Sequence, residues 1–150
     1  MTATTTLLML LLVADGKSRC VIYVPERVMA DDVKVGSNER PAYEAEMNRR
    51  RLRESAKDLA VYFQKMTGVE VPLRTGKPDP AAQEIPILIG ELAVERFGPP
   101  KTQAILKQAF RIVVTGEAVG LIGESDLAAS YAVYEVLDRL GCRWFMPSDM

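Results

Sequence analysis

Residues 110–141 read FRIVVTGEAVGLIGESDLAASYAVYEVLDRLG, and this stretch decides the fold class. Its first residues, 110–115, alternate between two faces, and residues 119–123 form a second apolar run. The triplet Gly-Glu-Ala between the two runs has the composition of a turn. Two short apolar runs separated by a few residues that include glycine are typical of a β-hairpin. The stretch therefore opens with a predicted pair of antiparallel strands.

An amphipathic helix is predicted for residues 126–140, directly after this hairpin. Ser125 is a suitable N-cap, and Gly141 is a stop signal at the other end. Apolar side chains at helical spacing define the expected buried stripe, which consists of Leu127, Tyr131, Tyr134 and Leu137, widened by Val133, Val136 and Leu140. An apolar face this wide is typical of a helix that lies flat on a sheet.

A longer helix is predicted for residues 41–66. Pro41 suits its first turn, and Gly68 lies where a C-terminal stop is expected. Apolar residues step by three and four along this segment and predict one core-facing stripe, made of Leu52, Ala56, Leu59, Phe63 and Met66. The chain is thus predicted to contain two long helices, and the apolar stripe of each must be buried against another part of the fold.

The remaining segments between these elements are shorter. Residues 85–90, IPILIG, predict a strand, and residues 69–73 predict a short strand that Pro72 places at a sheet edge. Residues 28–40 are polar and predict a loop. Residues 91–108 predict helical pieces that are broken at a Gly-Pro-Pro triplet.

The N-terminal segment admits two interpretations. Residues 7–13 and 20–24 are apolar runs that flank Asp15-Gly16, a strong hairpin signal, so we favour a second β-hairpin. The alternative is that residues 7–13 are the core of a signal peptide. No lysine or arginine precedes this run, and no small-x-small cleavage site follows it, which favours the strand.

The predicted order is β-β-α-β-β-(α)-β-β-α. Because paired strands joined by hairpins dominate it, we expect an α+β fold. The expected architecture is a two-layer sandwich, with a mixed or mostly antiparallel sheet and two long helices on one face. The 150 residues have the length of a single domain. We assign residues 1–147 to it and expect residues 148–150 to begin a connector to a downstream domain.

The composition of the chain excludes several kinds of chemistry. The sequence contains no histidine, which removes the commonest general base and the commonest metal ligand. The formal net charge is −1, so no large positive field attracts nucleic acid or an anionic membrane. No metal-ligand spacing, phosphate-binding glycine loop or cofactor motif is present. We therefore expect no catalytic, metal or cofactor residues in this chain.

Charged clusters were the remaining candidates for a site. Three carboxylate pairs are close in sequence: Glu91/Glu95, Glu124/Asp126 and Glu135/Asp138. Glycosidic cleavage uses two carboxyl groups, but pairs like these are usually solvated helix faces, and none is expected to face a cleft. The four arginines within residues 49–53 are expected to form mixed-sign surface pairs with nearby acids, such as Glu46 with Arg50.

The two cysteines and the C-terminal aromatic segment leave alternatives open. Cys20 and Cys142 each lie in an apolar run and are expected to be buried thiols, with a disulfide between them as the alternative. Arg143, Trp144 and Phe145 follow the last predicted helix. They predict either a final strand of the sheet or contacts at a junction with the next domain.

Several segments together resemble one known setting. They are residues 59–73 (LAVYFQKMTGVEVPL), 85–90 (IPILIG), 110–123 (FRIVVTGEAVGLIG) and 131–147 (YAVYEVLDRLGCRWFMP). In this order they resemble the N-terminal domain before the catalytic barrel of family 67 α-glucuronidases. They are also similar to the second domain of family 20 β-hexosaminidases and to related bacterial proteins with a glycoside-hydrolase-like barrel. The most specific motif is the helix that runs into Leu-Gly-x-Arg-Trp-Phe-x-Pro.

The resemblance implies a non-catalytic accessory domain that supports a downstream catalytic barrel of the same polypeptide. It also implies an extracellular or periplasmic location and contact with poly- or oligosaccharide through the parent protein. A carbohydrate-binding module and a small standalone interaction domain are the alternatives. A binding module of this kind needs exposed aromatic platforms, whereas most aromatic residues here fall on predicted buried stripes.

Overall fold

The computed structural model of the chain describes residues 19–102 and 104–141. Within these ranges the elements are β1 (Cys20–Val24), α2 (Glu26–Met29), α3 (Ala42–Thr67), β2 (Leu73–Thr75), β3 (Ile85–Ile89), α4 (Glu91–Phe97), β4 (Phe110–Val114), β5 (Val119–Gly123) and α5 (Asp126–Arg139). The two long helices, α3 and α5, lie where apolar spacing predicts them. This confirms the α+β class.

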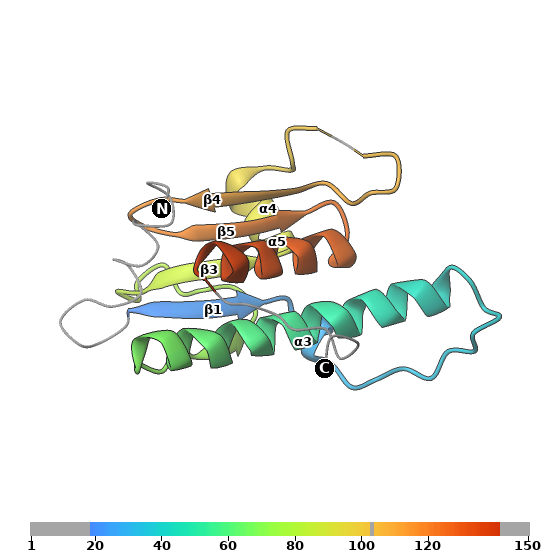
Figure 1. Cartoon of the computed structure of the whole chain (residues 1–150), viewed down its shortest axis with the longest axis horizontal. Helices are drawn as coiled ribbons and strands as arrows, with labels where there is room; N and C mark the ends of the chain where they lie inside the picture. The colour runs from blue at the N-terminus through green and yellow to red at the C-terminus, as the bar shows by residue number, and fades with distance from the viewer. Residues whose placement is uncertain (1–18, 103, 142–150) are drawn as a thin grey trace.

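The five strands form one mixed sheet in the order β2-β1-β3-β5-β4. β1 pairs in parallel with β2 and with β3, and β3 pairs in parallel with β5. β4 and β5 form the predicted antiparallel hairpin, and their arrows point in opposite directions in Figure 1. Of the two sheet types expected, the mixed one is confirmed, and parallel pairings predominate. The reason is that α3 carries the chain from the end of β1 back to the start of β2, and such crossovers join parallel strands.

The hairpin predicted for residues 7–13 and 20–24 is contradicted at its second strand. β1 has parallel strands on both edges, so the described strands beside it are β2 and β3. Residues 7–13 lie outside the described residues. Every residue of β1 is buried, and a strand that is apolar on both faces suits the centre of a parallel sheet. The Asp15-Gly16 turn signal that precedes β1 does not show which strands β1 will pair with.

Both faces of the sheet are covered. The larger core lies under α3 and α5 and includes Ile22, Leu59, Phe63, Ile87 and Leu137. The two helices on this face are confirmed, and they pack side by side in front of the sheet in Figure 1. A smaller cluster on the opposite face joins alternate strand residues to α4, and it contains Val21, Tyr23, Leu88, Leu92, Ala93 and Ile122. The short α4 therefore adds a partial third layer.

The buried stripe of α3 agrees with its prediction in four of five positions. Leu52, Ala56, Leu59 and Phe63 are fully buried, whereas Met66 is 40% exposed. The helix ends one residue later, at Thr67, and Gly68 takes the left-handed conformation (φ +73°), with its N–H bonded to the carbonyl of Gln64. Met66 lies in this last turn, next to the end of the helix.

The buried face of α5 agrees with its prediction in part: Val133, Val136 and Leu137 are buried, whereas Leu127 and Leu140 are half-buried. Its fully buried side chains include Ala129, Ala132, Val133 and Leu137, whereas Tyr131 is 40% exposed. The prediction of Tyr131 as a core residue is therefore wrong. The inner face combines these alanines with Val133, Val136 and Leu137, and it packs against both the sheet and α3.

Tyr134, also expected in the buried stripe of α5, is half-buried and connects the two long helices. Its hydroxyl donates a hydrogen bond to Asp58 Oδ2 of α3 at 3.0 Å. Burial and this hydrogen bond raise the pKa of Tyr134 to about 12. The residue thus links α5 to α3 and also packs against the larger core.

Shorter elements differ from their predictions mainly in their bounds. The edge strand predicted at residues 69–73 is β2, which lies at the sheet edge but begins at Leu73. The helical prediction for residues 91–108 is confirmed for α4, which ends at Phe97 and is followed by Gly98. The loop prediction for residues 28–40 is wrong at its start, because residues 28 and 29 are the last two residues of α2. Cys20 is fully buried, as expected, and Cys142 lies outside the described residues.

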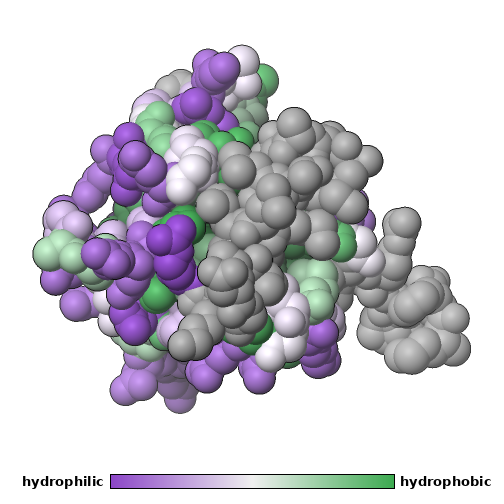
Figure 2. Space-filling model, turned by 90° about the vertical axis from the view of Figure 1, so that its left-hand side faces the viewer, coloured by the Kyte–Doolittle hydropathy of each residue, from purple (hydrophilic) through white to green (hydrophobic). Residues whose placement is uncertain are grey.

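Figure 2 shows the hydropathy of the described residues that are visible on one side of the molecule. There, hydrophobic residues form separate spots among hydrophilic ones. Among residues 19–102 and 104–141, no helix is long and apolar enough to cross a membrane.

Replacing Gly123 by alanine is expected to destabilise the fold by roughly 2–3 kcal/mol, because there is no room for a side chain between β5 and α5 at this position. A Cβ there would come within 2.6 Å of the Ala128 carbonyl carbon and closer still to the amide of Ala129, both backbone atoms of α5. Urea unfolding measures the effect. Gly116→Ala is the control, since a Cβ at that turn meets nothing within 4 Å, and it should change stability by less than about 0.5 kcal/mol. Equal effects of the two variants would contradict the close packing of α5 against β5.

Candidate functional site

A cleft of about 520 Å³ lies at the carboxyl ends of the parallel strands β1, β3 and β5. Residues that directly follow these strands line it: Arg27 after β1, Glu91 after β3, and Glu124 and Asp126 after β5. In open sheets with parallel strands, ligands bind outside the carboxyl ends of the strands, at the point where successive connections diverge to opposite sides. Here β1 connects to β2 on one side, while β3 leads to β4 and β5 on the other. The cleft is therefore the first place to look for a site.

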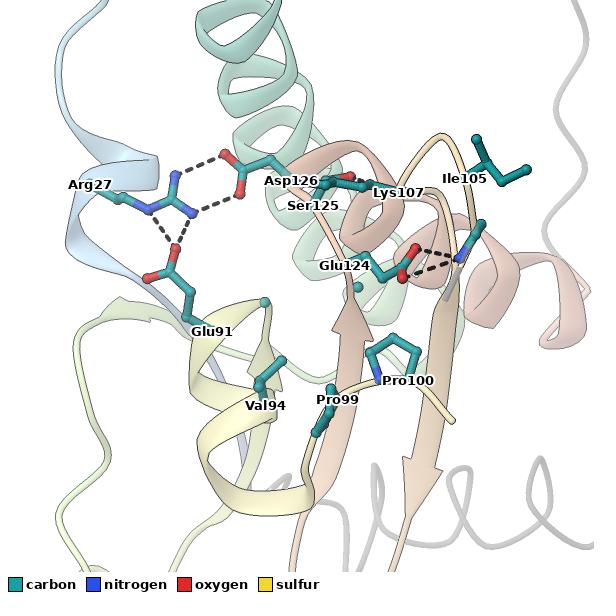
Figure 3. Close-up of a pocket in the computed structure, with 13 residues that line it drawn as sticks. Arg27, Glu91, Val94, Pro99, Pro100, Ile105, Lys107, Glu124, Ser125 and Asp126 are labelled. Atoms are coloured by element: carbon teal, nitrogen blue, oxygen red, sulfur yellow. Dashed lines mark hydrogen bonds and ion pairs between the residues drawn. The ribbon is translucent and has the colours of Figure 1, made fainter. Parts of the chain in front are cut away.

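Arg27 joins the two sides of this cleft. Its Nη1 and Nη2 donate to the two carboxylate oxygens of Asp126, at 2.8 and 2.7 Å. Its Nε donates to Glu91 Oε1 at 2.7 Å, and its Nη2 also contacts this oxygen. Figure 3 shows the guanidinium between the two carboxylates. The hydrogen bond to Asp126, followed by that to Glu91, raises the pKa of Arg27 further above its ordinary value.

Local structure brings these three side chains together. Gly90 has φ +68°, a conformation that favours glycine, and it turns the chain from β3 directly into α4. Glu91 is the first residue of α4, and Asp126 is the first residue of α5. Carboxylates are favoured at helix N-termini by the peptide dipoles. The two acids are thus placed where two helices start, and Arg27 of α2 lies between them.

Glu124 and Ser125 hold the loop that forms the far wall of the cleft. The Glu124 carboxylate accepts hydrogen bonds from the backbone N–H of Ala104, at 3.2 Å, and of Ala109, at 3.0 Å. Ser125 caps α5 by accepting from the N–H of Ala128, as predicted, and its hydroxyl donates to the carbonyl of Lys107 at 2.7 Å. The carboxylate and the hydroxyl therefore attach residues 104–109 to the start of α5.

The same loop carries an unusual backbone conformation. Lys107 has φ +52°, which is uncommon for a residue other than glycine. Its N–H bonds to the carbonyl of Ala104, and its own carbonyl accepts from Ser125, so the conformation is supported from two sides. Ile105, two residues earlier, is fully exposed at the rim of the cleft.

The structure corrects one prediction about the carboxylate pairs. Glu91, Glu124 and Asp126 were expected on solvated faces away from any cleft, yet all three line this one. Spacing along the sequence could not predict this cleft. Glu91 and Asp126 come close together only because β3 and β5 are parallel neighbours in the sheet. A usable signal was present: each acid follows an apolar strand that ends in glycine. The other members behave as expected, since Glu95 pairs with Lys77, and Glu135 pairs with Arg139.

The arginine run of α3 is confirmed in part as a set of surface pairs. Arg50 Nε lies 3.1 Å from Glu46 Oε1, as the spacing predicts, and Arg53 pairs with Asp32. Arg49 differs, because it is buried together with Glu46. The run is therefore partly a component of the interior.

The described residues offer few groups for chemistry. Within residues 19–102 and 104–141, no three histidine, cysteine or acidic side chains are arranged to hold a metal ion. All buried side-chain nitrogen and oxygen atoms of these residues have a hydrogen-bond partner. The candidate junction residues Arg143, Trp144 and Phe145 lie outside the described ranges. The cleft thus consists of acids and bases that mainly bind one another or the backbone.

Comparisons with known proteins add no assignment: no protein-family model matches the chain, and no match was found among curated proteins.

Proposed function

We propose that this chain is a non-catalytic accessory domain of a larger, glycoside-hydrolase-like protein, where it supports a downstream catalytic barrel. One observation about the cleft carries the non-catalytic part. Each of its three carboxylates joins segments of the chain: Glu91 and Asp126 bind Arg27, and Glu124 binds the backbone of residues 104–109.

Glycoside cleavage requires two carboxyl groups that can reach the substrate, and the carboxylates of the cleft do not provide them. One carboxyl group must donate a proton to the leaving oxygen, and a second must act as a nucleophile or activate water. Asp126 has both oxygens engaged by a guanidinium, and Glu124 accepts from two backbone amides. Such bonds orient a carboxylate toward the protein and away from a substrate. The cleft is therefore better suited to holding three strand ends together.

The carbohydrate part of the proposal rests on the resemblance carried by the sequence. Three of the segments that carry it, residues 59–73, 85–90 and 110–123, supply the end of α3 and the strands β3, β4 and β5. Most of the fourth segment is α5. The motifs thus supply part of both cores, whereas β1 and α4 lie outside them. An extracellular or periplasmic location is part of the same proposal.

Exposed aromatic side chains, which a carbohydrate platform requires, are few among the described residues. Of their aromatic side chains, Phe110 (39%) and Tyr131 (40%) are the exposed ones. They lie on β4 and α5, and neither lines the cleft. A module that binds sugars by stacking is therefore the weaker alternative.

The purified chain is expected to release no product from a panel of aryl glycosides above the rate in buffer. The measurement is the release of the aryl group, with Glu124→Gln and Asp126→Asn as paired variants. Turnover that disappears in either variant would show that the cleft is catalytic and would overturn the proposal. Turnover that persists in both would point to a contaminating enzyme.

The parent protein is tested separately, by an immunoblot of source cells with an antibody against this chain. A species several times larger than 16.6 kDa is expected, and it would then be assayed on glycosides. A native product of 16.6 kDa would contradict a role as one domain of a larger protein.

A further inference from the structure

We propose that the cleft at the carboxyl ends of β1, β3 and β5 binds a neutral sugar ring. The choice of a sugar rests on the proposed function, whereas the choice of a neutral ligand rests on the charges of the cleft alone. The volume of about 520 Å³ is within the range of small-molecule sites and suits one or two sugar units.

The charges in the cleft are nearly balanced. Three carboxylates, from Glu91, Glu124 and Asp126, lie opposite the cations of Arg27 and Lys107. An anionic ligand would be repelled by the acids, and a cationic ligand would be repelled by Arg27 and Lys107. A neutral ligand with hydroxyl groups avoids both costs, because a hydroxyl can donate to a carboxylate oxygen or accept from a cation that the protein does not already engage.

Two charged groups retain bonding capacity toward such a ligand. Both contacts of Glu91 with Arg27 use Oε1, and Oε2 accepts no hydrogen bond from any described residue. The Glu91 side chain is 58% exposed, so this oxygen is open to a ligand. The Lys107 ammonium makes no ion pair within the described part of the chain, although Lys107 is held in place through its backbone.

The remaining lining is apolar. Val94, Pro99 and Pro100 lie along one side of the cleft in Figure 3, with Ile105 at the rim. A pyranose ring has hydroxyl groups around its edge and C–H groups on its faces. The charged side of the cleft matches that edge, and the proline side matches a face. The complete exposure of Ile105 leaves a large apolar side chain in water that a bound ring would partly cover.

The test is a ¹H–¹⁵N NMR titration of the whole chain with methyl β-D-glucopyranoside. The amides of Gly90, Val94, Gly123 and Glu124 should shift and saturate with a Kd of roughly 1 mM, as expected for a ligand this small. Cyclohexanol, which has a similar ring and a single hydroxyl, should bind at least about 10-fold more weakly, the effect of losing one good hydrogen bond. Absence of shifts at these amides up to about 50 mM sugar, or equal shifts with cyclohexanol, would overturn the proposal.

Two variants assign the binding to the charged side. Glu91→Gln should weaken binding about 10-fold, since it removes a charged acceptor while keeping the side-chain shape. Glu95→Gln is the matched control: it lies on the same helix, is 57% exposed against 58% for Glu91, and pairs with Lys77 outside the cleft. Lys107→Asn removes the ammonium and keeps a residue that tolerates positive φ, and it should also weaken binding. Equal weakening by Glu91→Gln and Glu95→Gln would contradict the assigned site.

The outcomes for this proposal and for the accessory role are separable. Absence of sugar binding would remove the cleft as a site and leave the non-catalytic role unaffected. Turnover of aryl glycosides that depends on Glu124 or Asp126 would remove the non-catalytic role and leave the binding result in place.

Discussion

Replacing Arg49 by leucine is expected to lower the free energy of unfolding by about 3 kcal/mol, one of the two largest effects predicted for a single substitution here. Removing one partner of a buried ion pair leaves the other charge without compensation, and this costs more than the pair itself contributes. The measurement is urea unfolding of both proteins, analysed with a common m-value.

The contacts of Arg49 explain this expectation. The side chain is 10% exposed, and its Nε and Nη2 donate to the Glu46 carboxylate at 2.8 and 2.6 Å. Its remaining donors bind four backbone carbonyls: those of Arg27, Val28, Ala30 and Asp31. Glu46 in turn accepts from the N–H of Val33. One guanidinium thus attaches the chain from α2 to Val33 onto α3.

The charge on Glu46 depends on the same contact. The hydrogen bond from Arg49, followed by that from the Val33 amide, holds the pKa of Glu46 well below its usual range. In the leucine variant this carboxylate would remain buried with one amide and Arg50 as its partners.

Arg51→Leu is the matched control for Arg49→Leu. Arg51 lies two residues further along α3, is exposed, and hydrogen-bonds the Asn48 side chain. Its replacement should change stability by less than about 0.5 kcal/mol. Similar losses in the two variants would show that the Arg49 contacts contribute no more than a surface arginine does.

Replacing Phe63 by alanine is expected to destabilise the protein by about 3–5 kcal/mol. Phe63 is fully buried in the larger core, between α3 and the sheet. Its removal would lose the transfer free energy of the ring and leave a cavity that close-packed neighbours fill only in part. Thermal or urea unfolding measures the loss.

Met66→Ala tests whether burial or helical spacing sets the size of this effect. Both residues belong to the same apolar stripe by their spacing, yet Met66 is 40% exposed in the last turn of α3. A loss below about 1 kcal/mol is expected for Met66→Ala. Losses of equal size at the two positions would mean that the end of α3 is covered in solution.

Local sequence patterns predicted the two long helices and the β4–β5 hairpin well. These elements depend on contacts between residues close in the chain, such as the Ser125 cap of α5 and the left-handed Gly68 after α3. The inner face of α5 was predicted less well, because the largest apolar residues were assumed to face inward. Ala128, Ala129 and Ala132 share this face with Val133, Val136 and Leu137, whereas Tyr131 lies on the exposed side.

Local sequence patterns could not predict the candidate cleft. Its acids were visible in the sequence, but Arg27 and Asp126 are 99 residues apart, and Glu91 is 64 residues from Arg27. Their meeting depends on β1, β3 and β5 being parallel neighbours, and strand order is set by long-range packing.

Composition and periods of two to four residues were sufficient to predict the two long helices, the strands β3, β4 and β5, and the α+β class, whereas α2 was not predicted. The tertiary structure alone decided which strands lie side by side, which face of α5 is buried and which charges share a cleft. The physical reason is that pairing and packing depend on the free energy of the whole assembly of elements, which no single segment contains.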